Sequence, residues 1–233
     1  SSDVCSSDLV SALVSVLLLC QVVEQGPLHY FLGSWVPPFG IEYKVDHLNS
    51  MVLCIVAVVS FLVAIFSKHA VEKELPDRIA HYYTLFVLLV TGLLGMTITG
   101  DAFNLYVLVE IAALTSYALL AMGKGRAYMS TFNYVIMGTI GACFYLLGVG
   151  YLYMKTGTLN MGDLSQLLPQ LHYSEAILVG FVLIMVGVWI KMAFFPLHGW
   201  LPNAYTFAPI ASSCLIAPLM TKVSVYIMIR MMF

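Results

Sequence analysis

Three charged side chains lie inside stretches of sequence that are otherwise apolar enough to cross a membrane. They are Glu110, Lys191 and Lys222. A charge at the bilayer centre costs at least ~2.5–3.5 kcal/mol, so such residues usually face a protein interior or a wet path. A carboxylate close to a buried ammonium raises the proton affinity of that ammonium, and its withdrawal lowers that affinity. A Lys–Glu pair of variable spacing can therefore take up and release a proton near neutral pH, which points to an ion route.

The composition places this chain among integral membrane proteins. Of its 233 residues, 61% are hydrophobic and 9% are charged, against roughly 25% charged in an average soluble domain. The net charge of −2 with scattered basic residues leaves no electrostatic footprint for nucleic acid. The cysteines show no metal-ligand spacing, so we expect no metal site, and we predict that the four in apolar segments are small core residues. Those four are Cys20, Cys54, Cys143 and Cys214.

Seven segments can span or nearly span a bilayer, which takes about 20 helical residues. They are residues 9–23, 49–67, 79–99, 101–121, 130–154, 176–205 and 209–230. In the fifth, Gly138 and Gly141 indicate close helix contacts. The sixth contains Pro196 and Pro202, each of which removes a backbone donor and disfavours a continuous helix. The sequence thus predicts a broken helix, with the break five residues after Lys191. Such a break survives at membrane depth only where protein or water surrounds it.

Two connections have regular patterns of their own. Residues 26–48 are too polar to cross the membrane, and apolar and charged residues alternate over 41–46, which predicts a small extramembrane β-hairpin with 28–32. Four leucines at helical spacing within 156–175 predict a short amphipathic helix at the interface. Basic residues in short loops favour a cytoplasmic position for the 68–78 and 122–128 loops, which leaves the hairpin outside. Residues 1–9 repeat the tripeptide Ser-Ser-Asp, and we interpret them as a non-native leader.

Each charged residue also has a plainer interpretation. Glu110 lies near the middle of its segment, and the alternative is a structural carboxylate that only joins helices. Lys191 would be an interfacial anchor if its helix ended before Pro196. Lys222 has eight residues after it in its span, so its alternative is a lysine that snorkels to the interface. Pro218 cannot donate to the Cys214 carbonyl, so a free acceptor is left near this lysine. His198 has the chemistry of a proton relay, although a histidine at a helix break more often donates to a carbonyl.

Two motifs carry a resemblance to a known family. TGDAFNLYVLVEIAALTSYALLA (99–121) and KMAFFPLHGWLPNAYTFAPIASSCLIAPLMTKVSVYIMIR (191–230) resemble the antiporter-like subunits of Mrp-type cation/proton antiporters, respiratory complex I and membrane-bound hydrogenases. The resemblance implies two inverted five-helix repeats, each with a broken helix. It also implies that Glu110 is the carboxylate partner, Lys191 the lysine of the broken helix, and Lys222 the next lysine of a polar axis.

The same resemblance sets the expected organisation. Residues 10–78 would hold the N-terminal helices with the hairpin, and 79–233 the proton-conducting transmembrane domain as a first repeat. Members of this family are about twice this length, so we expect the chain to be a fragment without the second repeat. The run GDAFNLYVLVE resembles the D-type subunit of the Mrp antiporters more than the complex I paralogues.

The leading hypothesis is a proton-translocating subunit of a multisubunit monovalent cation/proton antiporter in a bacterial or archaeal cell membrane. Its partners would be other membrane subunits and protons, with Na⁺ or K⁺ as candidate exchanged ions. The alternative is a proton-pumping subunit of complex I or of a membrane-bound hydrogenase. No flavin, haem, iron–sulfur or dinucleotide motif is present in the sequence, so redox chemistry would belong to partner subunits. A seven-helix receptor and a purely structural subunit are the remaining hypotheses.

Overall fold

The computed structural model describes residues 2–171 and 174–232, and the chain is helical over most of this length. The long helices are α1 (Ser2–Gln25), α2 (His47–Glu74), α3 (Ile79–Ile98), α4 (Ala102–Ala121), α5 (Ala127–Thr156), α7 (Glu175–Lys191) and α9 (Ile210–Met232). Short elements connect them: β1 (Leu28–Phe31), η1 (Leu32–Ser34), β2 (Glu42–Val45), η2 (Pro76–Arg78), α6 (Met161–Leu167), η3 (Leu168–Gln170) and α8 (Leu201–Thr206).

Six of the described helices are long and apolar enough to cross a membrane, namely α1 from Val4, α2, α3 with η2, α4, α5 and α9. The seventh expected span is a broken helix. Its first part, α7, has 17 residues, slightly fewer than the about 20 that a full crossing takes. Non-helical chain follows α7, and α8 resumes the helix at Leu201. The prediction of an all-α membrane protein with one broken helix is therefore confirmed.

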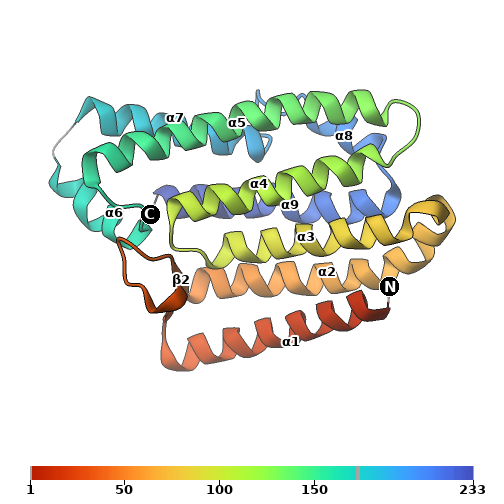
Figure 1. The fold of residues 1–233 in the computed structure, drawn as a ribbon, viewed down its shortest axis with the longest axis horizontal. Coiled ribbons are helices and arrows are strands. Elements are labelled where there is room, and N and C mark those ends of the chain that lie inside the picture. The colour runs from red at the N-terminus through yellow and green to blue at the C-terminus, as the bar shows by residue number, and fades with distance from the viewer. Residues whose placement is uncertain (1, 172–173, 233) are drawn as a thin grey trace.

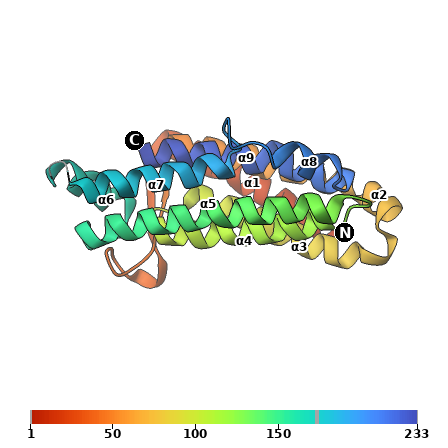
Figure 2. The same cartoon turned by 90° about the horizontal axis from the view of Figure 1, so that it is seen from above.

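The helices lie alongside one another, and α9 occupies a central place (Figure 1). It contacts α2, α3, α4 and α7, and its residues Leu215, Ile216 and Leu219 are fully buried. Figure 2 shows the bundle from above, with α4 and α5 in one row and α7 and α9 in the row beside it. A charged residue on the inward face of these helices therefore meets protein rather than lipid.

A glycine seam joins α5 to α7. A Cβ atom on Gly187 would lie 2.5 Å from the Gly141 carbonyl oxygen, and one on Gly148 would lie 2.5 Å from the Gly180 carbonyl oxygen. Small residues let helix backbones approach this closely inside a membrane. The prediction that Gly138 and Gly141 are helix-contact residues is confirmed, and the seam fixes the position of α7, which carries Lys191.

The predicted β-hairpin is present at one end of the bundle. Strands β1 and β2 pair antiparallel, with Leu28 opposite Val45 and Phe31 opposite Glu42. The Gly100 N–H donates to the Glu42 carbonyl at 2.8 Å, and the Met161 N–H donates to the Gly100 carbonyl at 2.8 Å. Backbone hydrogen bonds thus join the hairpin to the α3–α4 turn and this turn to the start of α6, all at one end of the bundle.

The two ends of the bundle differ in their basic residues, as the sequence predicts. The α2–α3 and α4–α5 connections lie at the end opposite the hairpin, α6 and the end of α9 (Figure 1). Lys44 in β2, Lys155 in the last turn of α5 and Arg230 in the last turn of α9 share the hairpin end. The assignment of the hairpin to the outer side of the membrane stays a prediction.

The cysteines and the first residues of the chain differ from expectation. All five cysteines are free, and Cys20, Cys143 and Cys214 are exposed on the helix bundle while Cys54 is half-buried, so the prediction that these four are core residues is wrong. A thiol is small and apolar enough to lie on an outward helix face that meets lipid or a partner. Residues 2–9 continue the first helix instead of standing apart, while their non-native origin stays a prediction.

Candidate functional site

Glu110 and Lys191 meet inside the bundle. The Nζ atom of Lys191 lies 3.4 Å from Oε1 of Glu110. Only 8% of the Lys191 side chain and 23% of the Glu110 side chain are exposed. Glu110 lies near the middle of α4, and Lys191 is the last residue of α7. The alternative of an interfacial anchor for Lys191 does not fit this burial, because a snorkelling lysine would have its ammonium in the headgroup region.

The chain leaves the helical path directly after Lys191. Ala193 has φ +57°, a conformation that ends a right-handed helix. The Trp200 indole Nε1–H donates to the Ile190 carbonyl at 3.1 Å, which satisfies one of the acceptors that a helix C-terminus leaves open. The C-terminal end of the α7 dipole is also favourable for a cation. The break thus places Lys191 at a helix end within the bundle.

The prolines have different roles from the one predicted. Pro196 lies within the non-helical stretch, as expected. Pro202 instead occupies the first turn of α8, where its missing N–H has no helical partner to lose. The helix therefore ends at Lys191 itself, five residues earlier than predicted, because the turn begins at Ala193 rather than at the first proline.

A small cavity borders Lys191. Its volume is about 30 Å³, and its lining includes Tyr106, Tyr145, Lys191 and Ser224. A cavity of this size holds one or two water molecules where polar partners are present. Ser224 belongs to α9, so the cavity extends from Lys191 towards the central helix.

Lys222 is not part of this pair. It lies exposed on α9, and its Nζ donates to the Ala217 carbonyl at 2.8 Å. The predicted acceptor was the Cys214 carbonyl, and the structure places the ammonium on the carbonyl of the residue before Pro218 instead. Within the described residues, Lys222 has no ion pair with Glu110.

His198 lies exposed in the break, and its ring packs against Phe195 with centroids 5.6 Å apart. The structure does not bring it to the Glu110–Lys191 pair. Neither the relay nor the carbonyl contact predicted for it is among the hydrogen bonds of the described residues.

Sequence reasoning missed the residues that support the break. Tyr134 stacks on Trp200 with ring centroids 4.1 Å apart and planes 5° from parallel. The Tyr117 ring meets Tyr134 edge-on at 4.6 Å. In the sequence these aromatic residues resemble ordinary packing residues. Only Tyr117 could have been linked to the site, because it lies seven residues after Glu110 and therefore on the same helix face.

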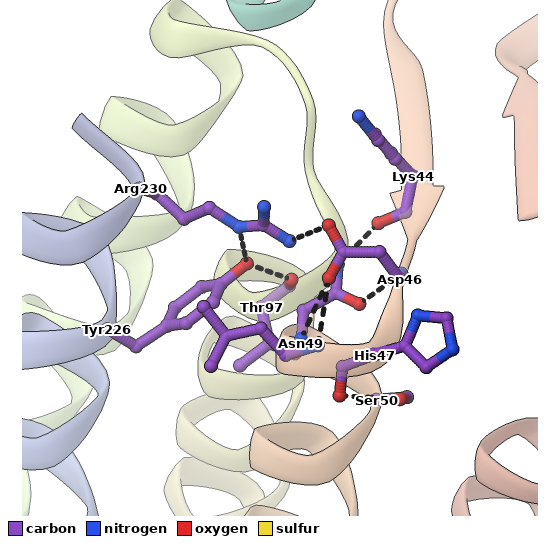
Figure 3. Close-up of polar contacts among 9 residues, drawn as sticks. Lys44, Asp46, His47, Asn49, Ser50, Thr97, Tyr226 and Arg230 are labelled. Carbon is purple, nitrogen blue, oxygen red and sulfur yellow. Dashed lines mark hydrogen bonds and ion pairs between the residues drawn. The ribbon is translucent and has the colours of Figure 1, made fainter. Parts of the chain in front are cut away.

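A second charged cluster lies at the hairpin end. Arg230 pairs with Asp46 at 2.5 Å, and its Nε donates to the Tyr226 hydroxyl at 2.9 Å. That hydroxyl in turn donates to the Thr97 carbonyl at 2.8 Å (Figure 3). Asp46 also caps α2 by accepting from the Leu48 and Asn49 backbone N–H groups. This cluster joins the start of α2, the end of α3 and the end of α9.

Two carboxylates at this end are held ionised. Burial would raise the pKa of the Asp46 carboxyl, but the Arg230 guanidinium and the backbone donors outweigh burial and lower it. Burial likewise opposes ionisation of Glu42, and the contacts with His29 and Asn160 outweigh it, so the pKa of Glu42 is also lowered. The hairpin end of the bundle therefore carries a charged, hydrogen-bonded network.

The fold and the buried pair together define a multi-pass membrane protein with a charged couple at a broken helix. Residues 99–233 match the family model for the transmembrane region of NADH:quinone oxidoreductase and Mrp antiporter proteins. The chain belongs to this family, which confirms the resemblance found in the sequence and removes the seven-helix receptor.

Relatives with several activities are similar to it. The chain is 44% identical over 224 residues to NADH-quinone oxidoreductase subunit N of Desulforudis audaxviator, covering 96% of this chain and 45% of that protein. It is 32% identical over 226 residues to the D-type subunit of the Na⁺/H⁺ antiporter of Bacillus subtilis, covering 97% of this chain and 45% of that protein. The chain thus spans about half the length of the curated relatives it matches.

Two solved complexes contain a similar fold. A chain of the membrane-bound sulfane sulfur reductase, an archaeal respiratory membrane complex, matches with TM-score 0.90 and 36% identity, covering 97% of this chain and 46% of that one. A chain of the Mrp complex from Dietzia sp. DQ12-45-1b matches with TM-score 0.86 and 25% identity, covering 99% of this chain and 43% of that one.

Proposed function

We propose that this chain is a proton-translocating module of a multisubunit monovalent cation/proton antiporter, similar to the D-type subunit of such antiporters. The observation that carries the proposal is the buried contact of Lys191 with Glu110 at 3.4 Å, at the end of a broken helix. Charged side chains inside a membrane are costly and mark ion and proton pathways. A chain that used the pair only to join helices would gain little, since a buried ion pair rarely stabilises more than apolar packing does.

The geometry of the pair suits a switch. Strong charge-assisted hydrogen bonds are about 2.7–2.9 Å long, so the 3.4 Å contact of Lys191 with Glu110 is a loose one. The glycine seam fixes α7, so a change in the spacing of the pair would come from the two side chains or from the non-helical chain after Lys191. Approach of Glu110 favours a protonated Lys191, and its withdrawal favours release of the proton. Lys191 is then the proton-binding group and Glu110 the electrostatic modulator.

Lys222 is proposed as the next group on the path. The small cavity beside Lys191 reaches the buried Ser224 on α9. Lys222 lies two residues before Ser224, on the exposed side of the same helix, so transfer to it would require its side chain to change position. The present contact of Lys222 with the Ala217 carbonyl would hold its ammonium until a proton is passed on. His198 remains a candidate relay at the exposed break.

The partners follow from the same proposal. Relatives and structural neighbours belong to multisubunit membrane complexes, so we propose that other membrane subunits cover parts of the apolar helix surface. Protons are the transported ions, and Na⁺ or K⁺ are the candidates for exchange. The chain itself would need no cofactor in this role.

A second candidate is a proton-pumping subunit of a respiratory complex. It is favoured by the 44% identity to an NADH-quinone oxidoreductase subunit N and by the TM-score of 0.90 to a subunit of a sulfane sulfur reductase. In that case the redox chemistry would occur in partner subunits, and the same Glu110–Lys191 pair would move the proton.

The test is transport by the full-length protein in its complex, reconstituted in vesicles with a dye that reports proton gradients. Lys191→Ala should abolish proton movement, and the exposed Lys155→Ala should leave it intact. Gradients of Na⁺, K⁺ and Li⁺ identify an exchanged ion, and an added electron donor identifies redox coupling. Unchanged transport by an assembled Lys191→Ala complex would contradict the proposal and support the purely structural subunit.

A further inference from the structure

Helix α2 holds α9 at both of its ends. At the hairpin end, Asp46 caps α2 and pairs with Arg230 in the last turn of α9. At the opposite end, Glu74 is the last residue of α2, and its Oε2 atom accepts from the Ile210 N–H at 3.1 Å. Ile210 is the first residue of α9. Each end of the central helix is therefore bound to a carboxylate from one end of α2.

The position of Glu74 is explained by α9 and not by its own helix. A carboxylate in the last turn of a helix meets the negative end of the helix dipole, whereas a carboxylate at the first turn meets the positive end. Glu74 lies at the unfavourable end of α2 and at the favourable end of α9. Pro209, the residue before α9, has no side-chain acceptor for the first N–H groups of this helix. Glu74 supplies an acceptor from another helix instead.

These two contacts are stronger than the neutral bonds that join α9 to its other neighbours. Hydroxyl groups of α9 donate to backbone carbonyls of α4, α8 and α3, from Ser212 to Leu119, from Ser213 to Tyr205 and from Tyr226 to Thr97. Hydrogen bonds with an ionised partner are roughly twice as strong as neutral ones. Both charged contacts come from α2, which also packs along α9 and has no proline within it.

The depth of α9 in the bundle decides which of its residues lies beside Lys191. Ser224 lines the cavity that borders Lys191, and the volume of this cavity is only about 30 Å³. Lys222 lies two residues before Ser224 on the same helix. A shift of α9 by one residue moves both side chains by about 1.5 Å along the bundle. A cavity that holds one or two water molecules would be closed or displaced by such a shift.

We infer that α2 sets the depth of α9 through these two contacts, which makes Glu74 and Arg230 positioning residues for Ser224 and Lys222. The inference rests on the proposed function, because that function assigns α9 to the path beyond Lys191. Since α9 is a continuous helix, either contact alone fixes its depth. Loss of both contacts leaves α9 free to move along α2.

The experiment removes the two contacts singly and together in the full-length protein in its complex. Glu74→Ala deletes the acceptor at one end of α9, and Arg230→Met deletes the guanidinium at the other end while Asp46 still caps α2. Each single variant should lower the rate of proton transport by no more than about twofold. Sites this far apart normally act independently, so two such effects would multiply to at most about fourfold. We expect the double variant to lose at least about tenfold, because both contacts act on one helix.

Two further combinations separate positioning from a general loss of stability. Glu72→Ala removes an exposed carboxylate two residues before Glu74, and its combination with Arg230→Met should stay within about fourfold of the wild-type rate. Glu74→Gln keeps an oxygen that accepts from the Ile210 N–H, so its combination with Arg230→Met should recover most of the transport. All rates are compared at a temperature at which every complex is folded and assembled.

Hydrogen exchange tests the Glu74 contact without reference to transport. Exchange at the start of α9 should be about fivefold faster in Glu74→Ala, the factor that one lost hydrogen bond represents. Unchanged exchange there, or transport by the double variant within about fourfold of wild type, would overturn the inference. Either result leaves the proposed function in place where Lys191→Ala abolishes transport. Normal transport by Lys191→Ala would instead refute the proposed function, and the inference with it.

Discussion

Two ion pairs in this chain are built in opposite ways. Lys191 and Glu110 meet at 3.4 Å through one contact, inside the bundle and at a helix end. Arg230 and Asp46 meet at 2.5 Å, and each has further partners, Tyr226 for the arginine and backbone N–H groups for the carboxylate. The Lys191–Glu110 pair has a single contact at a depth where a charge is costly. The Arg230–Asp46 pair has several hydrogen bonds and lies at the end of the bundle.

The different anchoring of the two pairs indicates different roles. A guanidinium with several fixed hydrogen bonds gains rigidity and stays charged, so the Arg230–Asp46 pair fastens α9 to the start of α2. A lysine ammonium with one long contact changes its protonation readily when buried. We call Lys191–Glu110 the inner pair and Arg230–Asp46 the outer pair. We expect substitutions at the inner pair to affect transport and substitutions at the outer pair to affect stability.

The largest effect is expected from Glu110→Gln. This change leaves Lys191 without a negative partner, and a buried ammonium without one loses its proton. Proton transport by the complex should fall at least about 100-fold, a loss within the range for a proton-transfer group. Dye-reported gradients in vesicles measure it, with Glu175→Gln at the start of α7 as the control. Transport above a tenth of the wild-type rate would place the switch elsewhere.

The surroundings of the Lys191–Glu110 pair and the hairpin could be predicted from the sequence. A charge in an apolar span is visible without a structure, and so are the hairpin alternation and the two prolines near Lys191. Aspartate is a preferred helix N-cap residue, and Asp101 before α4 accepts from the Asn104 N–H at 2.7 Å. Features of this kind are determined by residues close together in the sequence, so they can be predicted without knowledge of the fold.

The remaining features depend on contacts that are distant in the sequence. Arg230 and Asp46 lie at opposite ends of the chain, and no periodicity indicates that they meet. The helix ends at Lys191 because of Ala193 and the cap from Trp200, which are ordinary residues in the sequence. The exposure of Lys222 follows from the rotation of α9 among four other helices, which the sequence of α9 alone does not determine.

At the outer pair, Asp46→Asn should lower the free energy of unfolding by about 2 kcal/mol. The change leaves the partly buried Arg230 guanidinium without a counter-charge, and breaking one side of such a pair is costly. Thermal unfolding of the full-length protein in detergent measures the loss. Proton transport at a temperature where the variant is folded should stay within about twofold of wild type. A strong transport defect in the folded variant would show that the hairpin end takes part in conduction.

The outer pair also predicts how stability depends on pH. The folded-state pKa values of Asp46 and Glu42 are lowered, so their contribution is fully present above the unfolded values and is lost as the pH falls through the folded ones. The ordinary values are 3.8 for Asp46 and 4.5 for Glu42, so the melting temperature should decrease as the pH falls from about 5 towards 3. Asp46→Asn should flatten this decrease, and an unchanged slope would remove Asp46 as its cause.

The smallest effect is expected from His198→Asn. His198 follows Lys191 closely in the sequence, yet it is exposed and packs on Phe195 rather than on the Glu110–Lys191 pair. Because it shares no contact with that pair, its loss should change the transport rate less than about twofold. The pH profile of transport is the decisive readout, since an imidazole in the path would add a pH dependence that asparagine lacks. A profile that shifts in His198→Asn, with assembly intact, would extend the path from Lys191 into the helix break and make the inner pair one part of a longer relay.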